Sequence, residues 1–368
     1  MKYMNKTLML MAAALMAFSA CDKWTETEPV NVIYETLESK NPDLYAKYLQ
    51  SLRDYHASAH QVLIAKFDNK AEAPSGRADH ISCLPDSVDF VVLNNPSLLN
   101  DQIRKEMTEI REQKGVKTLM NVSWDAMLAE YNAILADETE AKNAEWDALS
   151  DEEKEAQAEK YASDPRGADT QERFVAWMQE RVAKELEIPA AEGFDGINVI
   201  FNAANPNSYN EEKKADMTAR QLAFFSKVDD FVAAHPESLV FFEGTPKYIL
   251  AENKIIAAAR YIIVPALSET NGTGLSFAVN KALGGNVPSD RVIIGVTAVD
   301  ITDPTNTNGI FSDGSAIVGA ANWAVDPAVG YVKAGVCVDH AQFDYYDITN
   351  VYSQINKAIS IMNPSPVK

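Results

Sequence analysis

Two asparagines and an isoleucine at alternate positions of one apolar segment are the first candidates for a site. The segment 193–202 reads GFDGINVIFN, and Asn198, Ile200 and Asn202 follow one another at intervals of two. In a strand, residues two apart point to the same face, so these three side chains share one side. Amide and aliphatic groups can hydrogen bond and pack, but they cannot donate a proton as an acid does. This face of the segment therefore offers hydrogen-bonding amides and an aliphatic group, and none of the three side chains is an acid.

Short apolar segments separated by helical stretches must position these residues. Such segments indicate parallel strands that are buried on both faces. About eight repeats favour an α/β fold of the (β/α)8 TIM barrel type over a doubly wound open sheet. No Gly-rich phosphate loop follows the first segment, which disfavours a nucleotide-binding sheet. The expected strands are 62–67, 88–93, 116–122, 194–201, 239–243, 261–267, 291–299 and 331–340.

One stretch departs from this repeat. Residues 125–169 are rich in Ala, Glu, Asp and Lys and poor in large apolar residues. We predict a helical insertion after strand three, whose charge marks a solvated face; the alternative is that it walls one side of a cleft. Gly115 is well placed to end the helix before strand three. Amphipathic helices are expected over 44–58, 101–114, 173–187, 220–235 and 352–362.

At the fourth strand, GFDGINVIFN resembles the catalytic strand of family 18 glycoside hydrolases, the chitinases and endo-β-N-acetylglucosaminidases. That strand reads F-D-G-x-D-x-D-x-E, and the resemblance covers roughly residues 44–362, the insertion excepted. In the family, the last acid protonates the leaving oxygen. The acid two before it steadies the substrate's acetamido group, which acts as the nucleophile. Asn202 and Ile200 stand at these two positions here, and Asn198 stands at the acid before them.

The resemblance implies a binding protein that has lost its catalysis. Loss of the proton donor alone costs about 10²–10⁴ in rate. We therefore expect a non-enzyme that captures GlcNAc-containing glycans, host N-glycans above all, with no cofactor and no metal. The resemblance also implies a surface glycosidase and an outer-membrane importer complex as partners. The alternative is an active endo-β-N-acetylglucosaminidase or chitinase-like hydrolase that uses a displaced carboxylate.

Ligands of such barrels bind at the carboxyl ends of the strands, so the residues there are candidate sugar contacts. Aromatic rings stack on sugar faces, and Trp124, directly after strand three, is the first candidate platform; core packing is its alternative. Asp68, Asn69, Asn94, Asn95 and Ser123 also lie at expected strand ends. The predicted glycan-binding residues are Trp124, Asn202, Asn205, Glu243, Glu269, Asp300, Asp339, Gln342, Trp323 and Tyr345.

The amino terminus is typical of an exported lipoprotein. Residues 1–20 combine two lysines, an apolar run and a small-residue end, which is the layout of a signal peptide. The ending before Cys21 resembles a bacterial lipobox, which implies lipidation of that cysteine; an ordinary secretory signal is the alternative. We expect 21–40 to be a tether and 41–368 the barrel. The implied location is the outer membrane, lipid-anchored and exposed at the cell surface.

Charge and rare residues narrow the function further. The chain has 33 basic and 53 acidic side chains, and removal of residues 1–20 changes the net charge from −20 to −22. Such acidity disfavours nucleic acid as a partner. Cys83 and Cys337 can pair or stay as thiols, and their apolar neighbours favour buried thiols. His56 and His60 lie four apart on an expected helix, but no third metal ligand is evident, which favours a structural role.

Overall fold

The computed structural model describes residues 37–312, 314–346 and 350–365. The chain divides into two compact units, Met1–Tyr48 and Leu49–Lys368, and the second contains the barrel. The predicted signal peptide, Cys21 and the tether up to residue 36 lie outside the described residues.

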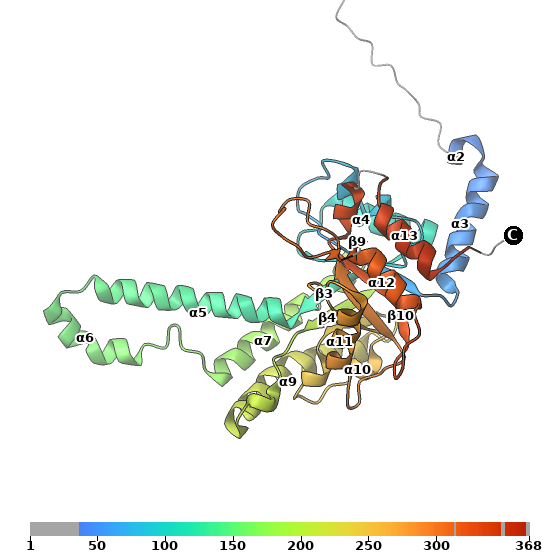
Figure 1. Cartoon of the computed structure of the whole chain (residues 1–368). Coiled ribbons are helices and arrows are strands. Elements are labelled where there is room, and N and C mark those ends of the chain that lie inside the picture. Colours follow the sequence, from blue (N-terminus) through green and yellow to red (C-terminus); the bar gives the residue numbers. More distant parts are fainter. Residues whose placement is uncertain (1–36, 313, 347–349, 366–368) are drawn as a thin grey trace, which may run out of the picture. The chain divides into compact units, whose positions relative to one another are not determined.

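Eight parallel strands close into a barrel, which confirms the predicted (β/α)8 architecture (Figure 1). Neighbours along the chain are hydrogen-bonded neighbours in the sheet, and the last strand closes the ring by pairing Val62–Ala65 with Gly335–Val338. Strands such as VLIAKF are buried on both faces, because their side chains pack alternately into the barrel interior and against the outer helices. The barrel strands are β1 (Val62–Phe67), β2 (Phe90–Leu93), β3 (Lys117–Ser123), β4 (Gly196–Phe201), β5 (Leu239–Gly244), β6 (Tyr261–Pro265), β7 (Val292–Thr297) and β10 (Lys333–Asp339).

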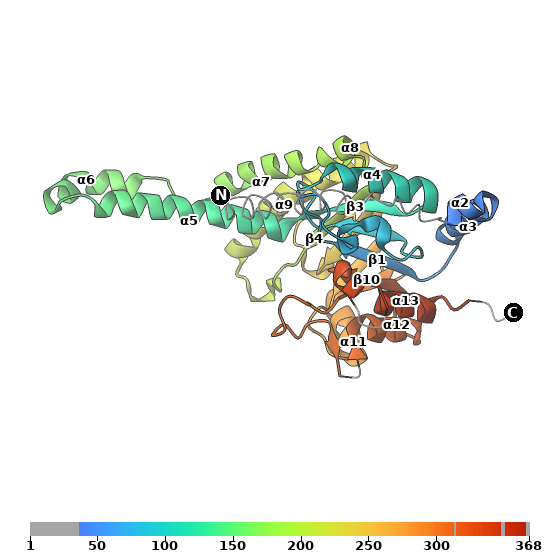
Figure 2. The same ribbon diagram turned by 90° about the horizontal axis from the view of Figure 1, so that it is seen from above.

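Within the second unit, helices surround the barrel (Figure 2). The predicted helix 101–114 is α4 followed by one π-helical turn, and Gly115 ends it with a φ of 84°, as expected. None of the helices within the described ranges is both long and apolar enough to cross a membrane. The helices are α2 (Leu37–Lys40), α3 (Pro42–Ala57), α4 (Asp101–Glu109), α5 (Trp124–Asp147), α6 (Asp151–Ser163), α7 (Gln171–Glu185), α8 (Ile188–Glu192), α9 (Glu211–Ala234), α10 (Ile255–Ala258), α11 (Gly272–Ala282), α12 (Ala316–Val325) and α13 (Ser353–Met362).

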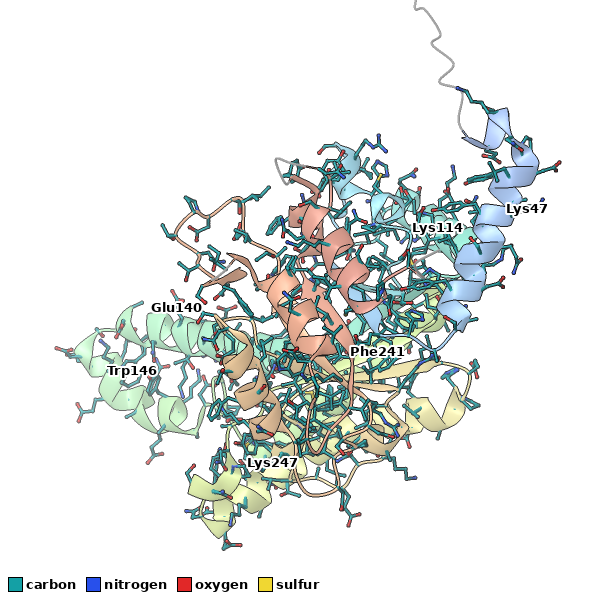
Figure 3. The ribbon with its side chains drawn as sticks, turned by 45° about the vertical axis from the view of Figure 1, so that its right-hand side comes forward. Lys47, Lys114, Glu140, Trp146, Phe241 and Lys247 are labelled. Atoms are coloured by element: carbon teal, nitrogen blue, oxygen red, sulfur yellow. The ribbon has the colours of Figure 1, made fainter. Side chains whose placement is uncertain are left out.

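The predicted insertion is a helical hairpin made of α5 and α6. Both helices extend away from the barrel, as the two ribbon views and the labelled Trp146 show (Figures 1, 2 and 3). A capping box between Ser150 and Glu153 starts α6, which contains no buried residue. Trp146 packs on Tyr161 with ring centroids 4.4 Å apart, so the hairpin is held largely by local contacts.

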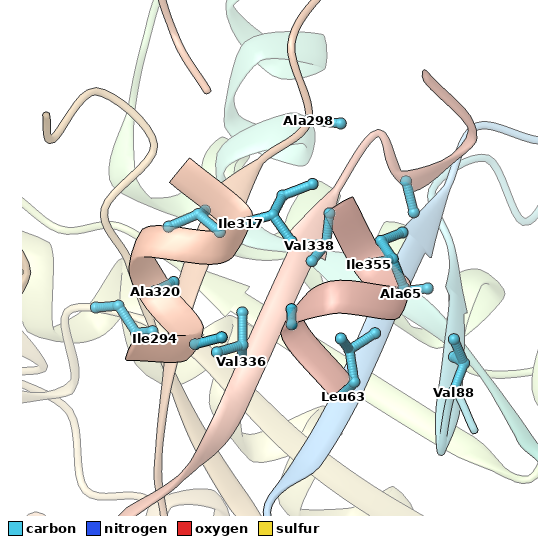
Figure 4. Packing of buried hydrophobic residues seen from close by; sticks show 14 of the residues in the cluster. Leu63, Ala65, Val88, Ile294, Ala298, Ile317, Ala320, Val336, Val338 and Ile355 are labelled. Atoms are coloured by element: carbon cyan, nitrogen blue, oxygen red, sulfur yellow. The ribbon is translucent and has the colours of Figure 1, made fainter. Parts of the chain in front are cut away.

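Apolar side chains fill both sides of the sheet. Alternate residues of β1 divide between them: Ile64 belongs to the interior cluster, whereas Leu63 lies on the outer side in the cluster that includes Ile355 of α13 (Figure 4). Cys337 lies in the interior as a buried free thiol, and burial raises its pKa. Cys83 also forms no disulfide but is only partly buried, so the expectation of buried thiols is met in full by Cys337 alone. The interior cluster comprises Val62, Ile64, Phe90, Val92, Leu119, Phe241, Ile263, Ile293 and Cys337.

His56 and His60 have a structural role at the amino end of the barrel. Their ring nitrogens lie 3.0 and 2.7 Å from the same carboxylate oxygen of Asp89. The other Asp89 oxygen accepts a hydrogen bond from the Leu63 amide at 2.8 Å. The prediction of one shared helix is wrong, because α3 ends at Ala57, before His60. Asp89 thus ties the segments before β1 and β2 together.

The charge state of this cluster predicts a pH window of stability. Burial alone raises the pKa of Asp89, but hydrogen bonds from His56, His60 and Leu63 lower it. The hydrogen bond to Asp89 in turn raises the pKa of His60. The Asp89 contribution is lost as pH falls through its lowered pKa, and the His60 contribution is lost as pH rises through its raised one. Both are complete between about pH 4 and 6.5, the unfolded-state values of these groups.

Replacement of Asp89 by asparagine is expected to lower the free energy of unfolding by about 2 kcal/mol in this window. The deficit should shrink towards both strongly acidic and alkaline pH. Urea denaturation of both proteins across pH measures it. A deficit that does not change with pH would show that the cluster acts by shape and not by charge.

Candidate functional site

A buried ion pair lies at the carboxyl end of the barrel. Lys66 of β1 is only 5 % exposed, and its Nζ lies 2.9 Å from Glu243 Oε1 and 3.6 Å from Asp339 Oδ2. Burial by itself lowers the pKa of Lys66, but the two carboxylates together raise it, so the amine stays charged. At this end, the interior of the barrel therefore contains charged side chains instead of apolar ones.

A chain of amides continues from the ion pair across four strands. Asn198 Nδ2 donates to Glu243 Oε2 at 2.7 Å and to Asn121 Oδ1 at 2.9 Å. Asn121 Nδ2 donates to Asn94 Oδ1 at 2.9 Å, and Asn94 Nδ2 donates to Asp68 Oδ1 at 2.7 Å. Asn198 Oδ1 is buried, and the described part of the chain gives it no hydrogen-bond partner. Asn198 thus belongs to the polar lining of the barrel, as its place in the alternating segment predicts.

Asp68 joins this chain to the end of β10. Its Oδ2 binds His340 Nδ1 and Gln342 Nε2. The hydrogen bond to Asp68 raises the pKa of His340, which stacks on Phe343 and keeps 44 % of its side chain exposed. His340 has a φ of 51°, a conformation that costs free energy in a non-glycine residue and often marks a functional site. We call the connected residues the mouth network: Lys66, Asp68, Asn94, Asn121, Asn198, Glu243, Asp339, His340 and Gln342.

A carboxylate from α5 lies beside the end of β4. Asp125 Oδ2 accepts hydrogen bonds from the Asn202 backbone N at 3.1 Å and from Asn202 Nδ2 at 3.0 Å. Burial raises the pKa of Asp125, the two Asn202 bonds oppose this, and the nearby Glu243 charge adds to it. Ile200 lies two residues before Asn202 and pairs in register with Glu243 of β5. Asn202, at the predicted position of the family's acid, therefore lies next to a carboxylate that follows β3.

The structure brings only some of the predicted contacts together. Five of the predicted residues belong to the mouth network, namely Asp68, Asn94, Glu243, Asp339 and Gln342, and Asn202 is held by Asp125. The other predicted contacts have local partners and, within the described ranges, form no hydrogen bond with the network. Asn205 accepts from Asn207, Asp300 accepts from Thr302 and Asp303, Glu269 packs against Gly274, and Tyr345 contacts Tyr346 and Tyr352.

The prediction of exposed tryptophan platforms is wrong for Trp124. This residue is 3 % exposed, and its ring packs on Phe174, Phe201 and Phe224 with centroids 5.5 to 5.7 Å apart. The reason is that α5 begins at Trp124 itself, directly after β3. The first turn of the helix carries the ring to the outer side of the barrel, among the side chains of α7 and α9.

The prediction is also wrong for Trp323. It lies on α12 and is 5 % exposed, with its Nε1 donating to Ser276 Oγ at 2.9 Å. Lys333 Nζ lies 4.1 Å above its ring, which completes the cover. Both tryptophans therefore stabilise the packing of helices on strands.

The sequence reasoning missed Lys66, Asn121, His340 and Asp125. Lys66 carried a clear signal, because in VLIAKF it shares a face with Val62 and Ile64. Asn121 has the same signal within its strand. Asp125 comes two residues after β3, but the sequence analysis assigned it to the insertion and did not consider it as a site residue.

Comparison with known proteins places this fold in a family. The model of glycoside hydrolase family 18, BT1044-like, matches residues 25–361. A selenomethionine form of BT1044 is 16 % identical, with 89 % of this chain and 95 % of that chain covered and a TM-score of 0.56. The Cordyceps militaris endo-beta-N-acetylglucosaminidase in apo form is 16 % identical, with 86 % and 96 % covered and a TM-score of 0.52.

A mutant of the Cordyceps militaris enzyme in complex with fucosyl-N-acetylglucosamine-Asn is 17 % identical, with 86 % of this chain and 95 % of that chain covered and a TM-score of 0.51. No curated protein matches this chain. At these identities the solved structures show a common fold, and the family match extends over most of the sequence. The chain belongs to glycoside hydrolase family 18, in its BT1044-like group.

Proposed function

We propose that this protein is a catalytically silent family 18 barrel that binds GlcNAc-containing glycans. The observation that carries the proposal is the end of β4, where Asn202 and Ile200 take the places of the family's acid and of the carboxylate that steadies the acetamido group. Glu243 and Asp339 cannot easily replace them, because both pair with the buried Lys66. At positions 200 and 202 of β4 the mouth has an aliphatic and an amide side chain where the family's reaction uses carboxylates.

The mouth network supports binding because its groups are already oriented. Each amide from Asn198 to Asn94 is fixed by its neighbour, so little side-chain entropy is lost when a sugar hydroxyl replaces water. The exposed part of His340 and the end of β4 offer both donors and acceptors. A neutral glycan suits such a surface.

The location and the glycan class complete the proposal. The signal-like residues 1–20 and Cys21 favour a lipid anchor in the outer membrane with the barrel at the cell surface. The fold shared with an endo-beta-N-acetylglucosaminidase bound to fucosyl-N-acetylglucosamine-Asn favours host N-glycans as ligands. A surface glycosidase and an outer-membrane importer complex are the proposed partners.

One incubation tests binding against cleavage. The mature protein is mixed with an N-glycoprotein, chitin oligomers or mucin glycans, and both retained glycan and released reducing ends are measured. We expect retention of GlcNAc-containing glycans and no release. Asn202→Ala should weaken retention by about tenfold, because a hydrogen-bonding group is lost.

The matched control is Asn286→Ala, an exposed amide before β7 at the amino end of the barrel. It should leave retention unchanged. A protein that retains no glycan of the panel would refute the proposed function.

Asp125 favours a second candidate, an active hydrolase with a displaced acid. Its carboxylate lies within hydrogen-bond reach of Asn202, at the family's acid position, and its pKa is raised. Two facts count against it: the Asn202 donors favour the ionised carboxylate, and Ile200 cannot steady an acetamido group. If this candidate were correct, reducing ends would be released and Asp125→Asn would abolish their release.

A further inference from the structure

The Asn202–Asp125 pair has more hydrogen-bond acceptors than donors left for a ligand. Both hydrogen bonds of the pair end on Asp125 Oδ2. A carboxylate only accepts, so the Asn202 amide must turn its nitrogen towards it, which fixes the orientation of the amide. Within the ranges that the structure describes, no group donates to Asp125 Oδ1 or to Asn202 Oδ1. One N–H of Asn202 Nδ2 remains as the pair's unused donor.

Under the proposed function, the anomeric oxygen of a bound GlcNAc lies at this pair, because Asn202 stands where the family has its acid. That oxygen is a hydroxyl in a released glycan and a bridging oxygen in a linked one, and the two satisfy the pair differently. A hydroxyl can donate to the Asp125 carboxylate and accept from the remaining N–H of Asn202. A glycosidic oxygen carries no hydrogen, so it can only accept from the amide. Its lone pairs would then face the Asp125 carboxylate, which would lose a water molecule and gain no donor. Because Asn202 is exposed and Asp125 is half-buried, the expected cost is about that of one lost hydrogen bond to a charged group.

We propose that the Asn202–Asp125 pair selects glycans with a free anomeric hydroxyl, that is, released oligosaccharides that end in a reducing GlcNAc. This inference rests on the proposed glycan binding and specifies the ligand end that the mouth prefers. Hydrolysis of a β-linked GlcNAc by an endoglycosidase is the class of reaction that supplies such an end. Glycans still linked to protein would be the poorer ligands.

The surrounding charges predict how the preference changes with pH. Glu243 is the charged group that faces Asp125 from β5, and Lys66 in turn pairs with Glu243. Burial, followed by the Glu243 charge, holds the pKa of Asp125 above the usual aspartate range despite the Asn202 bonds. Acidification through this pKa protonates Asp125, which then donates to a bridging oxygen. The preference for the free hydroxyl should therefore fall as the pH falls.

Calorimetric titration with paired ligands tests the selection. The probes are chitotetraose, which has a free anomeric hydroxyl, and its methyl β-glycoside, in which that oxygen is methylated and held in the β configuration. At neutral pH the wild-type protein should bind chitotetraose about tenfold more tightly than the methyl glycoside. Asp125→Asn, whose amide can turn a donor outward, should bring the two affinities within about twofold. Asp151→Asn, the same change on the exposed start of α6, should keep the wild-type ratio.

The outcomes separate this inference from the proposed function. Equal wild-type affinities for the two ligands would overturn the inference and leave glycan binding intact. Binding of neither ligand would overturn both. Cleavage of the methyl glycoside would show that Asp125 donates a proton, which also contradicts the inference.

Discussion

Replacement of Lys66 by methionine is expected to lower the free energy of unfolding by about 3–5 kcal/mol. The substitution leaves Glu243 buried without its cation, because Nζ supplies the 2.9 Å contact to that carboxylate. It also removes the charge that Asp339 faces at 3.6 Å. The loss should appear as a lower midpoint of urea denaturation with an unchanged slope.

A paired substitution shows whether charge is the cause. In the double variant Lys66→Met with Glu243→Gln, the amide still accepts from Asn198 Nδ2 and no unpaired charge is buried at Glu243. Most of the lost stability should return. Lys105→Met, at an exposed lysine of α4, is the control and should change little. A single variant as stable as the wild type would show that the ion pair does not hold the mouth network.

Replacement of Trp124 by alanine is expected to cost about 3–5 kcal/mol of unfolding free energy. Its ring is in contact with three phenylalanines from β4, α7 and α9, so the cavity cannot collapse without moving several elements. A surface platform would behave differently: its removal would weaken glycan binding and leave stability nearly unchanged.

Trp146→Ala in the hairpin is the matched control for this measurement. That ring is partly exposed and packs on Tyr161 alone among the aromatic residues, so its loss should cost about 1 kcal/mol. Thermal or urea unfolding of both variants measures the difference. Similar costs for the two substitutions would contradict the buried aromatic cluster around Trp124.

The strands were predictable because each is a short, continuous apolar run between polar stretches. The predicted and observed bounds agree for β1 and differ by about two residues elsewhere, as at Phe90, where β2 begins two residues after the predicted start. Small-residue helices were not predicted: α12 reads AIVGAANWAV, which lacks the polar face that marks an amphipathic helix. Its omission led to the wrong expectation for Trp323.

The sequence predicted where the candidate site lies but not which of its side chains form hydrogen bonds with one another. The carboxyl ends of the strands follow from barrel topology, and Glu243, Asp339 and Gln342 were placed there correctly. Which side chains bond to one another depends on register and rotamers, which periodicity does not contain. The Asn202–Asp125 contact joins residues 77 positions apart, and a helix boundary decides which way Asp125 points.

Release of reducing ends under single-turnover conditions tests the silent barrel most directly. Excess protein is held with a fluorescent N-glycopeptide and with labelled chitotetraose, so that even one slow turnover is detected. The account predicts that both ligands are recovered intact from the bound fraction. Product formation that disappears in Asp125→Asn would contradict it and would assign the protein to the active hydrolases.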